Sequence, residues 1–171
     1  MKHAIEGRLL VADILQPADI VDIGIEKEKK RRDFYALAAE HFKAKQELSA
    51  LFARLRDWEI EHIKRFEEIR GTVSRAQYTE SYAGETEAYM DALVDADLYA
   101  AITPEKFAGL VKTPLEALDR GIGFEKDAIL FFSQLSRFID PRSREIVDRL
   151  VNEEKQHLLY LFKMKKETAG K

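Results

Sequence analysis

The sequence predicts an all-α protein, a four-helix bundle in which two antiparallel helix hairpins are joined by a long crossover. Three observations favour this fold. Apolar residues recur at helical spacing in four long segments. Only four prolines and eight glycines interrupt the 171 residues, which leaves room for long helices. The second pair of helical segments also repeats residues of the first pair, about 100 positions later in the chain.

The first hairpin is expected over residues 17–70. Pro17 suits the first position of a helix, where its missing N–H costs nothing, and this helix is expected to continue to about Lys43. A short break near 45–47 precedes a second helix over about 47–70, which Gly71 is expected to end. So short a connection makes the two helices antiparallel neighbours.

Residues 72–113 are interpreted as the crossover, because a segment between two hairpins must travel back along the bundle. A helical piece is expected near 85–102 and another over 104–111. Thr103 and Thr113 each precede a proline, which is the pattern of a helix N-cap followed by a proline at the first helical position. Residues 1–16 are expected to form a short helix or arm, and we interpret 1–171 as a single domain.

The second hairpin is expected over residues 114–167. Its first helix should run from Pro114 to about Phe138, and Asp140 should cap the next helix, over about 141–167. The tail 167–171 is expected to fray. One side of this last helix is expected to carry Ile146, Leu150, Leu158, Leu161 and Phe162.

Composition excludes several classes of function. Hydrophobic residues make up 46% and charged residues 35% of the chain, which is typical of a folded helical protein. A net charge of −3 argues against a general nucleic-acid binder. Residues 1–16 do not form a signal peptide, and no 18-residue apolar stretch exists, so we expect a cytoplasmic protein with no membrane partner.

The repeat contains acidic residues and histidines at matching positions. Glu28 stands seven residues before Tyr35, and Glu59-x-x-His62 follows on the next helix. In the second hairpin Glu125 stands seven residues before Phe132, and Glu154-x-x-His157 follows. Glu28 and Glu125 are 97 positions apart, whereas Glu59 and Glu154 are 95 apart. The pattern therefore survives with a connection two residues shorter in the second copy.

These residues predict a dinuclear metal site. A Glu and a His three positions apart project from one face of a helix. In di-iron carboxylate bundles two helices each supply a Glu and the other two each supply a Glu-x-x-His. The candidate ligands here are Glu28, Glu59, His62, Glu125, Glu154 and His157. One Glu-x-x-His motif alone is weak evidence for a metal site, since roughly half an occurrence is expected by chance. Two copies at matching positions are stronger evidence. Four carboxylates balance two divalent ions, which favours two iron ions, with manganese as the alternative.

Other polar residues have a simpler interpretation. His3 and His41 lack any matching partner and are expected at the surface. The basic run 27–32 would ordinarily be a solvated helix face. Phe132 is expected in the core, while Tyr35 could also hydrogen-bond a ligand carboxylate and is our candidate catalytic residue.

At the residues just given, over 20–70 and 114–167, the chain resembles the rubrerythrin-like branch of the ferritin-like superfamily. The resemblance implies a di-iron centre, with Glu59 and Glu154 bridging the two metals and His62 and His157 each terminal on one of them. Glu28 and Glu125 would be the remaining terminal carboxylates. Members of the family reduce hydrogen peroxide, oxidise Fe(II) or carry out other dioxygen chemistry, and dimers are common, so a homodimer is expected.

The sequence departs from this family in two respects. It contains no cysteine, so it holds no rubredoxin centre, and a reductase would need an external electron donor. Arg31 and Arg32 follow Glu28 by three and four positions, where the second copy has Ala128 and Ile129. Such an arginine could pair with a ligand carboxylate, point to solvent, or neutralise Glu28 in a degraded half-site. Glu26 is an alternative ligand, but Asp33 stands where its aromatic should be, so Glu28 is preferred.

Three functions are therefore open. The first is a di-iron redox enzyme that reacts with hydrogen peroxide or dioxygen, in the manner of a peroxidase or ferroxidase. The second is a metal-binding or storage protein without a catalytic cycle. The third is a regulatory helical bundle whose site has lost its metal, an alternative that rests on the arginines beside Glu28.

Overall fold

The computed structural model describes residues 17–72, 103–137 and 139–170, and the regular structure in these ranges is helical. The first hairpin consists of α1, Pro17–His41, and α2, Gln46–Thr72. The second consists of α5, Pro114–Leu135, and α6, Pro141–Ala169.

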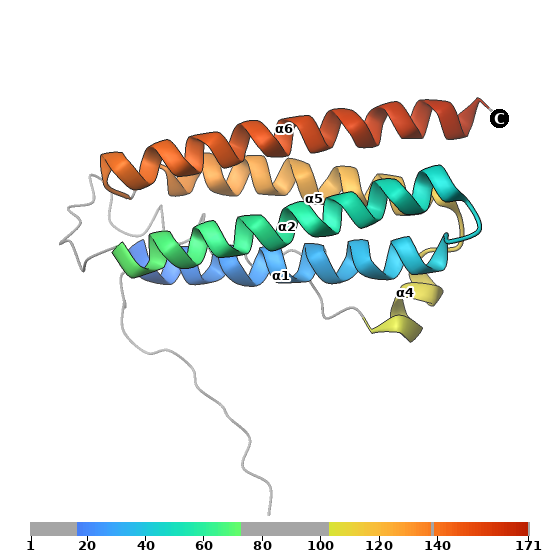
Figure 1. Cartoon of the computed structure of the whole chain (residues 1–171), viewed down its shortest axis with the longest axis horizontal. Coiled ribbons are helices and arrows are strands. Elements are labelled where there is room, and N and C mark those ends of the chain that lie inside the picture. Colours follow the sequence, from blue (N-terminus) through green and yellow to red (C-terminus); the bar gives the residue numbers. More distant parts are fainter. Residues whose placement is uncertain (1–16, 73–102, 138, 171) are drawn as a thin grey trace, which may run out of the picture.

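The two hairpins pack side by side as a four-helix bundle (Figure 1). The most extensive contacts are within each hairpin, between α1 and α2 and between α5 and α6, and the hairpins meet where α1 contacts α5 and α2 contacts α6. In each hairpin the two helices run in opposite directions (Figure 1). The predicted architecture is thus confirmed, although the expected N-terminal arm and the expected helix near 85–102 lie outside the described residues.

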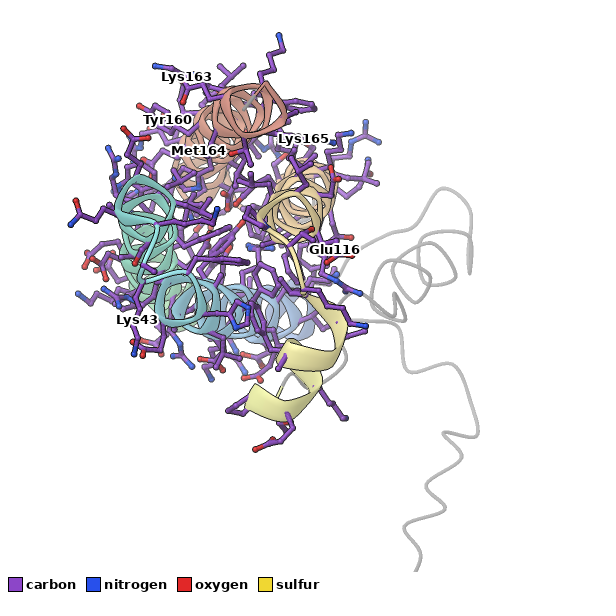
Figure 2. The ribbon with its side chains drawn as sticks, turned by 90° about the vertical axis from the view of Figure 1, so that its right-hand side faces the viewer. Lys43, Glu116, Tyr160, Lys163, Met164 and Lys165 are labelled. Atoms are coloured by element: carbon purple, nitrogen blue, oxygen red, sulfur yellow. The ribbon has the colours of Figure 1, made fainter. Side chains whose placement is uncertain are left out.

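The end of the crossover is a short helix, α4, Pro104–Leu110, which packs against α1. Phe107 is its buried residue, and its ring lies 5.4 Å from that of Phe34. Figure 2 views the bundle from the end that holds the α1–α2 turn, and α4 lies beside α1 in this view. The predicted helix over 104–111 is therefore present and anchored to the bundle.

The predicted caps are confirmed. Thr103 accepts a hydrogen bond from the Lys106 N–H at the start of α4. Thr113 forms a capping box with Glu116, because each side chain bonds the other residue's backbone N–H. Asp140 accepts from the N–H groups of the second and third residues of α6. Each cap fixes where a helix of the second half begins.

We expect Thr113→Ala to lower the free energy of unfolding by about 1 kcal/mol, the usual loss for an N-cap. The substitution removes the acceptor for the Glu116 N–H while leaving the proline at the first helical position. Chemical denaturation of both proteins would measure the difference. Thr168→Ala, near the end of α6, is a matched control that should change stability by less than about 0.5 kcal/mol. Equal losses for both variants would contradict the capping role.

The helix ends differ from the sequence expectations at three places. Gly71 does not end α2, which continues to Thr72, where the Thr72 hydroxyl donates to the Ile69 carbonyl. The expected fraying is wrong for residues 167–170, because α6 continues to Ala169 and the Gly170 N–H still bonds Lys166, whereas residue 171 lies outside the described residues. The helix that begins at Pro114 ends at Leu135, and Phe138 is not among the described residues.

The apolar core forms two clusters, one at each end of the bundle. The first includes Phe52, Leu55 and Phe124, and the second includes Phe66 and Phe131. Along every one of the four long helices, a short stretch with buried polar residues separates the residues of one cluster from those of the other. This polar layer contains the candidate metal ligands.

Phe162 was expected on the apolar side of α6, but it does not belong to the core. The buried face of α6 passes through Glu154, His157 and Leu161, and the next residue points about 100° away from it. Phe162 is 37% exposed and has the Lys126 ammonium 5.7 Å from its ring.

Candidate metal centre

The structure brings all six predicted ligands together in the centre of the bundle. Each of the four long helices contributes candidate ligands to this cluster. They are Glu28 from α1, Glu125 from α5, and the two Glu-x-x-His pairs from α2 and α6. The four carboxylates are fully buried and the two histidines nearly so. Charged groups are rarely buried unless they are paired or bind a metal, so this cluster requires a compensating charge.

The six residues form two overlapping sets in which the potential ligand atoms lie within 4.8 Å of one another. The Glu28 half-site consists of Glu28, Glu59, His62 and Glu154. The Glu125 half-site consists of Glu59, Glu125, Glu154 and His157. Glu59 and Glu154 belong to both sets, which is the arrangement that two carboxylates bridging two ions would need.

The buried polar atoms provide a direct test of whether the site suits metal ions. Eight atoms of the six residues have no hydrogen-bond partner among the described residues: both oxygens of Glu59 and of Glu154, one oxygen each of Glu28 and Glu125, and the Nδ1 atoms of both histidines. His157 Nδ1 is 2.8 Å from Glu154 Oε2, but the two atoms are not aligned for a hydrogen bond. Buried polar atoms are seldom left without partners. These eight atoms are the ones that two metal ions would engage, four each.

The other oxygens of the two terminal carboxylates are held by the protein. Tyr35 donates a hydrogen bond to Glu125 Oε1, and its hydroxyl also lies 3.5 Å from the Gly121 carbonyl. Tyr35 thus contacts a candidate ligand of the opposite hairpin, as the sequence suggested it could. Phe132, its counterpart in the repeat, is fully buried as expected.

Arg31 reaches the cluster as well. It is completely buried, and it donates a hydrogen bond to Glu28 Oε1. Lys27 is also buried and pairs with Asp127 at 3.0 Å. The expectation that residues 27–32 form a solvated face is therefore wrong for these two, because Arg31 reaches the buried Glu28 and Lys27 reaches the partly buried Asp127. Arg32 follows the expectation: it is partly exposed and pairs with Asp33.

The outer side of each histidine has a different environment. His62 Nε2 is 3.1 Å from Glu153, whose two oxygens accept hydrogen bonds from Arg65 at 2.7 and 2.8 Å. A carboxylate at this position fixes the ring and makes its other nitrogen a stronger ligand. His157 instead stacks on Trp58, with ring centroids 4.5 Å apart and planes within 4°. Neither Trp58 nor Glu153 was predicted as a partner of a histidine, although each immediately precedes a Glu of the repeat.

The acid–base state of the cluster without metal follows from burial and mutual charge. Burial and the neighbouring Glu154 charge raise the pKa of Glu125 to about 8. Burial also raises the pKa of Glu28 well above its usual range, against the opposing charge of Arg31. Burial alone would lower the pKa of His157, but its contacts with Glu125 and Glu154 raise it to about 10. Protons thus occupy part of the site near neutral pH.

We therefore expect metal binding to release protons and to become tighter as the pH rises from about 6 to 8. Ligation requires a deprotonated Glu125 and a neutral His157, and both have raised pKa values, so protons compete with the metal at lower pH. Calorimetric titrations of the metal-free protein in buffers of different ionisation enthalpy would count the protons. An affinity that is flat across this range, with no proton release, would contradict this protonation state.

Two further residues lie where the sequence placed them. Glu26, the alternative ligand, is exposed and pairs with Lys29, which leaves Glu28 as the carboxylate inside the cluster. His41 is exposed as expected, whereas His3 lies outside the described residues.

A pocket of about 530 Å³ opens at one end of the bundle, away from these residues. It is lined by the α1–α2 turn, by Pro114 at the start of α5 and by Met164 and Thr168 near the end of α6. Met164 is labelled in Figure 2, which views this end of the molecule. None of the six candidate ligands lines it, so the candidate chemistry belongs to the closed interior of the bundle.

Comparison with known proteins supports this interpretation of the site. A solved structure from Thermotoga maritima, provisionally described as a ferritin-like diiron-carboxylate protein, superposes with a TM-score of 0.70 and 26% sequence identity. The match covers 89% of this chain and 95% of the other. The fold is ferritin-like. Together with the buried carboxylate and histidine cluster, the match fits a di-iron protein and supports the ferritin-like di-iron superfamily.

No protein-family model matches the sequence, and no curated protein does. Within the described parts of the chain, no helix has an apolar stretch long enough to cross a membrane.

Proposed function

We propose that this protein is a di-iron carboxylate oxidoreductase of the rubrerythrin-like type, which reacts with hydrogen peroxide or dioxygen. The observation that carries the proposal is the set of eight buried ligand atoms without hydrogen-bond partners, divided into two overlapping half-sites. Their number and types match the ligand set of di-iron bundles.

In this proposal each residue has a defined part. Glu59 and Glu154 would help to hold both ions, because they belong to both half-sites and neither of their oxygens has a hydrogen-bond partner among the described residues. Glu28 and Glu125 would each offer Oε2 to one ion, and His62 and His157 would each offer Nδ1. Oxygen and imidazole ligands suit iron, with manganese as the alternative.

Bound iron would supply the redox electrons, and the chain supplies the environment. Tyr35 holds Glu125 so that its Oε2 stays directed at the site. The two apolar clusters on either side exclude bulk water from the buried carboxylates. The Trp58 ring covers one face of His157. Because the sequence contains no cysteine, electrons for a reductase cycle must come from an external donor.

The reaction with oxidants tests the proposal. The protein would be loaded with Fe(II) without oxygen and mixed with either hydrogen peroxide or dioxygen, while absorption is followed. Fast oxidation by peroxide and slow oxidation by dioxygen supports a peroxidase, and the reverse order supports a ferroxidase. A loaded protein that reacts with neither oxidant faster than free Fe(II) would refute the enzymatic proposal.

A second candidate is a metal-binding bundle without a catalytic cycle. The contact between Arg31 and Glu28 favours it, since a fixed cation beside a ligand carboxylate weakens that half-site. The same experiment separates the candidates, because this one predicts bound metal without turnover. The homodimer, the cytoplasmic location and the absence of nucleic-acid and membrane partners remain predictions, and the mass of the native protein would test the first.

A further inference from the structure

One half-site contains a cation inside its ligand set. The Arg31 guanidinium, besides bonding Glu28, places Nε 3.5 Å from Glu59 Oε2 and Nη2 3.6 Å from Glu154 Oε1. The same two oxygens face His62, whose Nδ1 is 3.4 Å from the first and 3.1 Å from the second. Arg31 therefore contacts all three carboxylates of the Glu28 half-site.

The repeat shows how this half-site differs from the other. In the Glu125 half-site, the non-ligating oxygen of Glu125 is held by the neutral hydroxyl of Tyr35. The counterpart of Tyr35 is Phe132, which has no hydroxyl, and the Arg31 guanidinium lies 5.4 Å from the centre of its ring. Arg31 thus takes over a hydrogen bond that a phenol makes in the other half. Arg31 does so from the same helix as Glu28, and it adds a full positive charge.

Neighbouring charges do not cancel this difference. Glu153 lies beside His62, but Arg65 bonds both of its oxygens, so the two together add no net charge. The buried Lys27 is likewise matched by Asp127. Both of these pairs are neutral, whereas Arg31 forms ion pairs with the ligand carboxylates themselves. A guanidinium cannot shed its charge by losing a proton when a metal ion approaches.

We propose that Arg31 makes the two half-sites unequal, so that the Glu125 half-site binds the first divalent ion and the Glu28 half-site binds the second more weakly. The inference rests on the proposed metal centre. Glu28 Oε2 has no hydrogen-bond partner, so Arg31 leaves a ligand atom available and does not block the second ion. Repulsion from the guanidinium at short range in a buried site weakens its binding. Arg31 is thus a positioning residue that sets the order of loading.

Titration of the metal-free full-length protein with Co(II), followed by absorption and calorimetry, tests this. We expect two steps of one ion each, with dissociation constants that differ by about tenfold or more. Two ions repel each other in any dinuclear site, so the decisive comparison is between variants. Arg31→Met, which is neutral and unbranched, should bring the two constants closer by about tenfold. Arg31→Lys keeps the charge and should preserve the separation.

A matched pair of variants, each lacking one terminal carboxylate, shows which half-site binds metal in which step of the titration. Glu28→Gln should weaken only the weaker step, and Glu125→Gln should weaken the tighter one. Circular dichroism would confirm that each variant remains helical, and the comparison of Arg31→Met with Arg31→Lys does not depend on the two glutamine variants. A single step of two equivalent ions, an unchanged separation in Arg31→Met, or the reverse assignment would overturn the inference alone. Failure of the wild-type protein to bind any Co(II) would overturn the metal centre as well.

Discussion

Replacing Glu154 with glutamine is expected to abolish tight binding of both metal ions. Both oxygens of Glu154 lack hydrogen-bond partners among the described residues, and the side chain belongs to both half-sites, so one substitution removes a candidate ligand from each. The affinity should fall by more than about 100-fold, since outer partners alone are worth about 10–100-fold. Metal analysis after dialysis would show the loss.

The adjacent residue provides the control. Glu153→Gln also removes one negative charge from α6, but Glu153 contacts the outer nitrogen of His62 and the Arg65 guanidinium and belongs to neither half-site. It should weaken binding by about tenfold, and in the Glu28 half-site alone. If Glu154→Gln kept both ions with the wild-type affinity, its place as a bridging ligand would be wrong.

The second large effect is on stability. Metal at 1,000 times its dissociation constant should stabilise the fold by about 4 kcal/mol through mass action. For a chain of this size that corresponds to a rise of roughly 10 °C in the melting temperature. The physical cause is local: without the ions, the four buried carboxylates repel one another or take up protons.

Thermal unfolding with metal and with a chelator would measure this effect. The Glu154→Gln variant is the control, since it should melt at the same temperature in both conditions. A wild-type protein whose melting temperature does not respond to saturating metal would show that the ions do not bind the folded cluster.

The clustering of the six candidate ligands could be predicted, because the repeat gives their positions. Glu28 and Glu125 stand at equivalent positions of two hairpins, and each Glu-x-x-His lies on the other helix of its hairpin. Helical spacing then requires the side chains to share one face. Two copies of one pattern constrain the three-dimensional site far more than either copy alone.

What surrounds the ligands could not be predicted in the same way. Arg31 lies in a run of basic residues that would ordinarily face water, and only the packing of α1 against its neighbours shows that it is buried. Trp58 and Glu153 occupy equivalent positions 95 residues apart, yet one stacks on a histidine and the other hydrogen-bonds one. The repeat identifies such positions, but their different side chains make the two half-sites chemically distinct.

The central prediction for this protein is a dinuclear metal centre. The amount of metal bound per chain tests this prediction most directly. Protein reconstituted with Fe(II) in the absence of oxygen, then freed of unbound metal, would be analysed for iron and protein together. We expect about two iron ions per chain, as in other di-iron bundles, and close to none in the Glu154→Gln variant. No retained iron in the wild-type protein, or the same amount in both proteins, would contradict a centre built from these six residues.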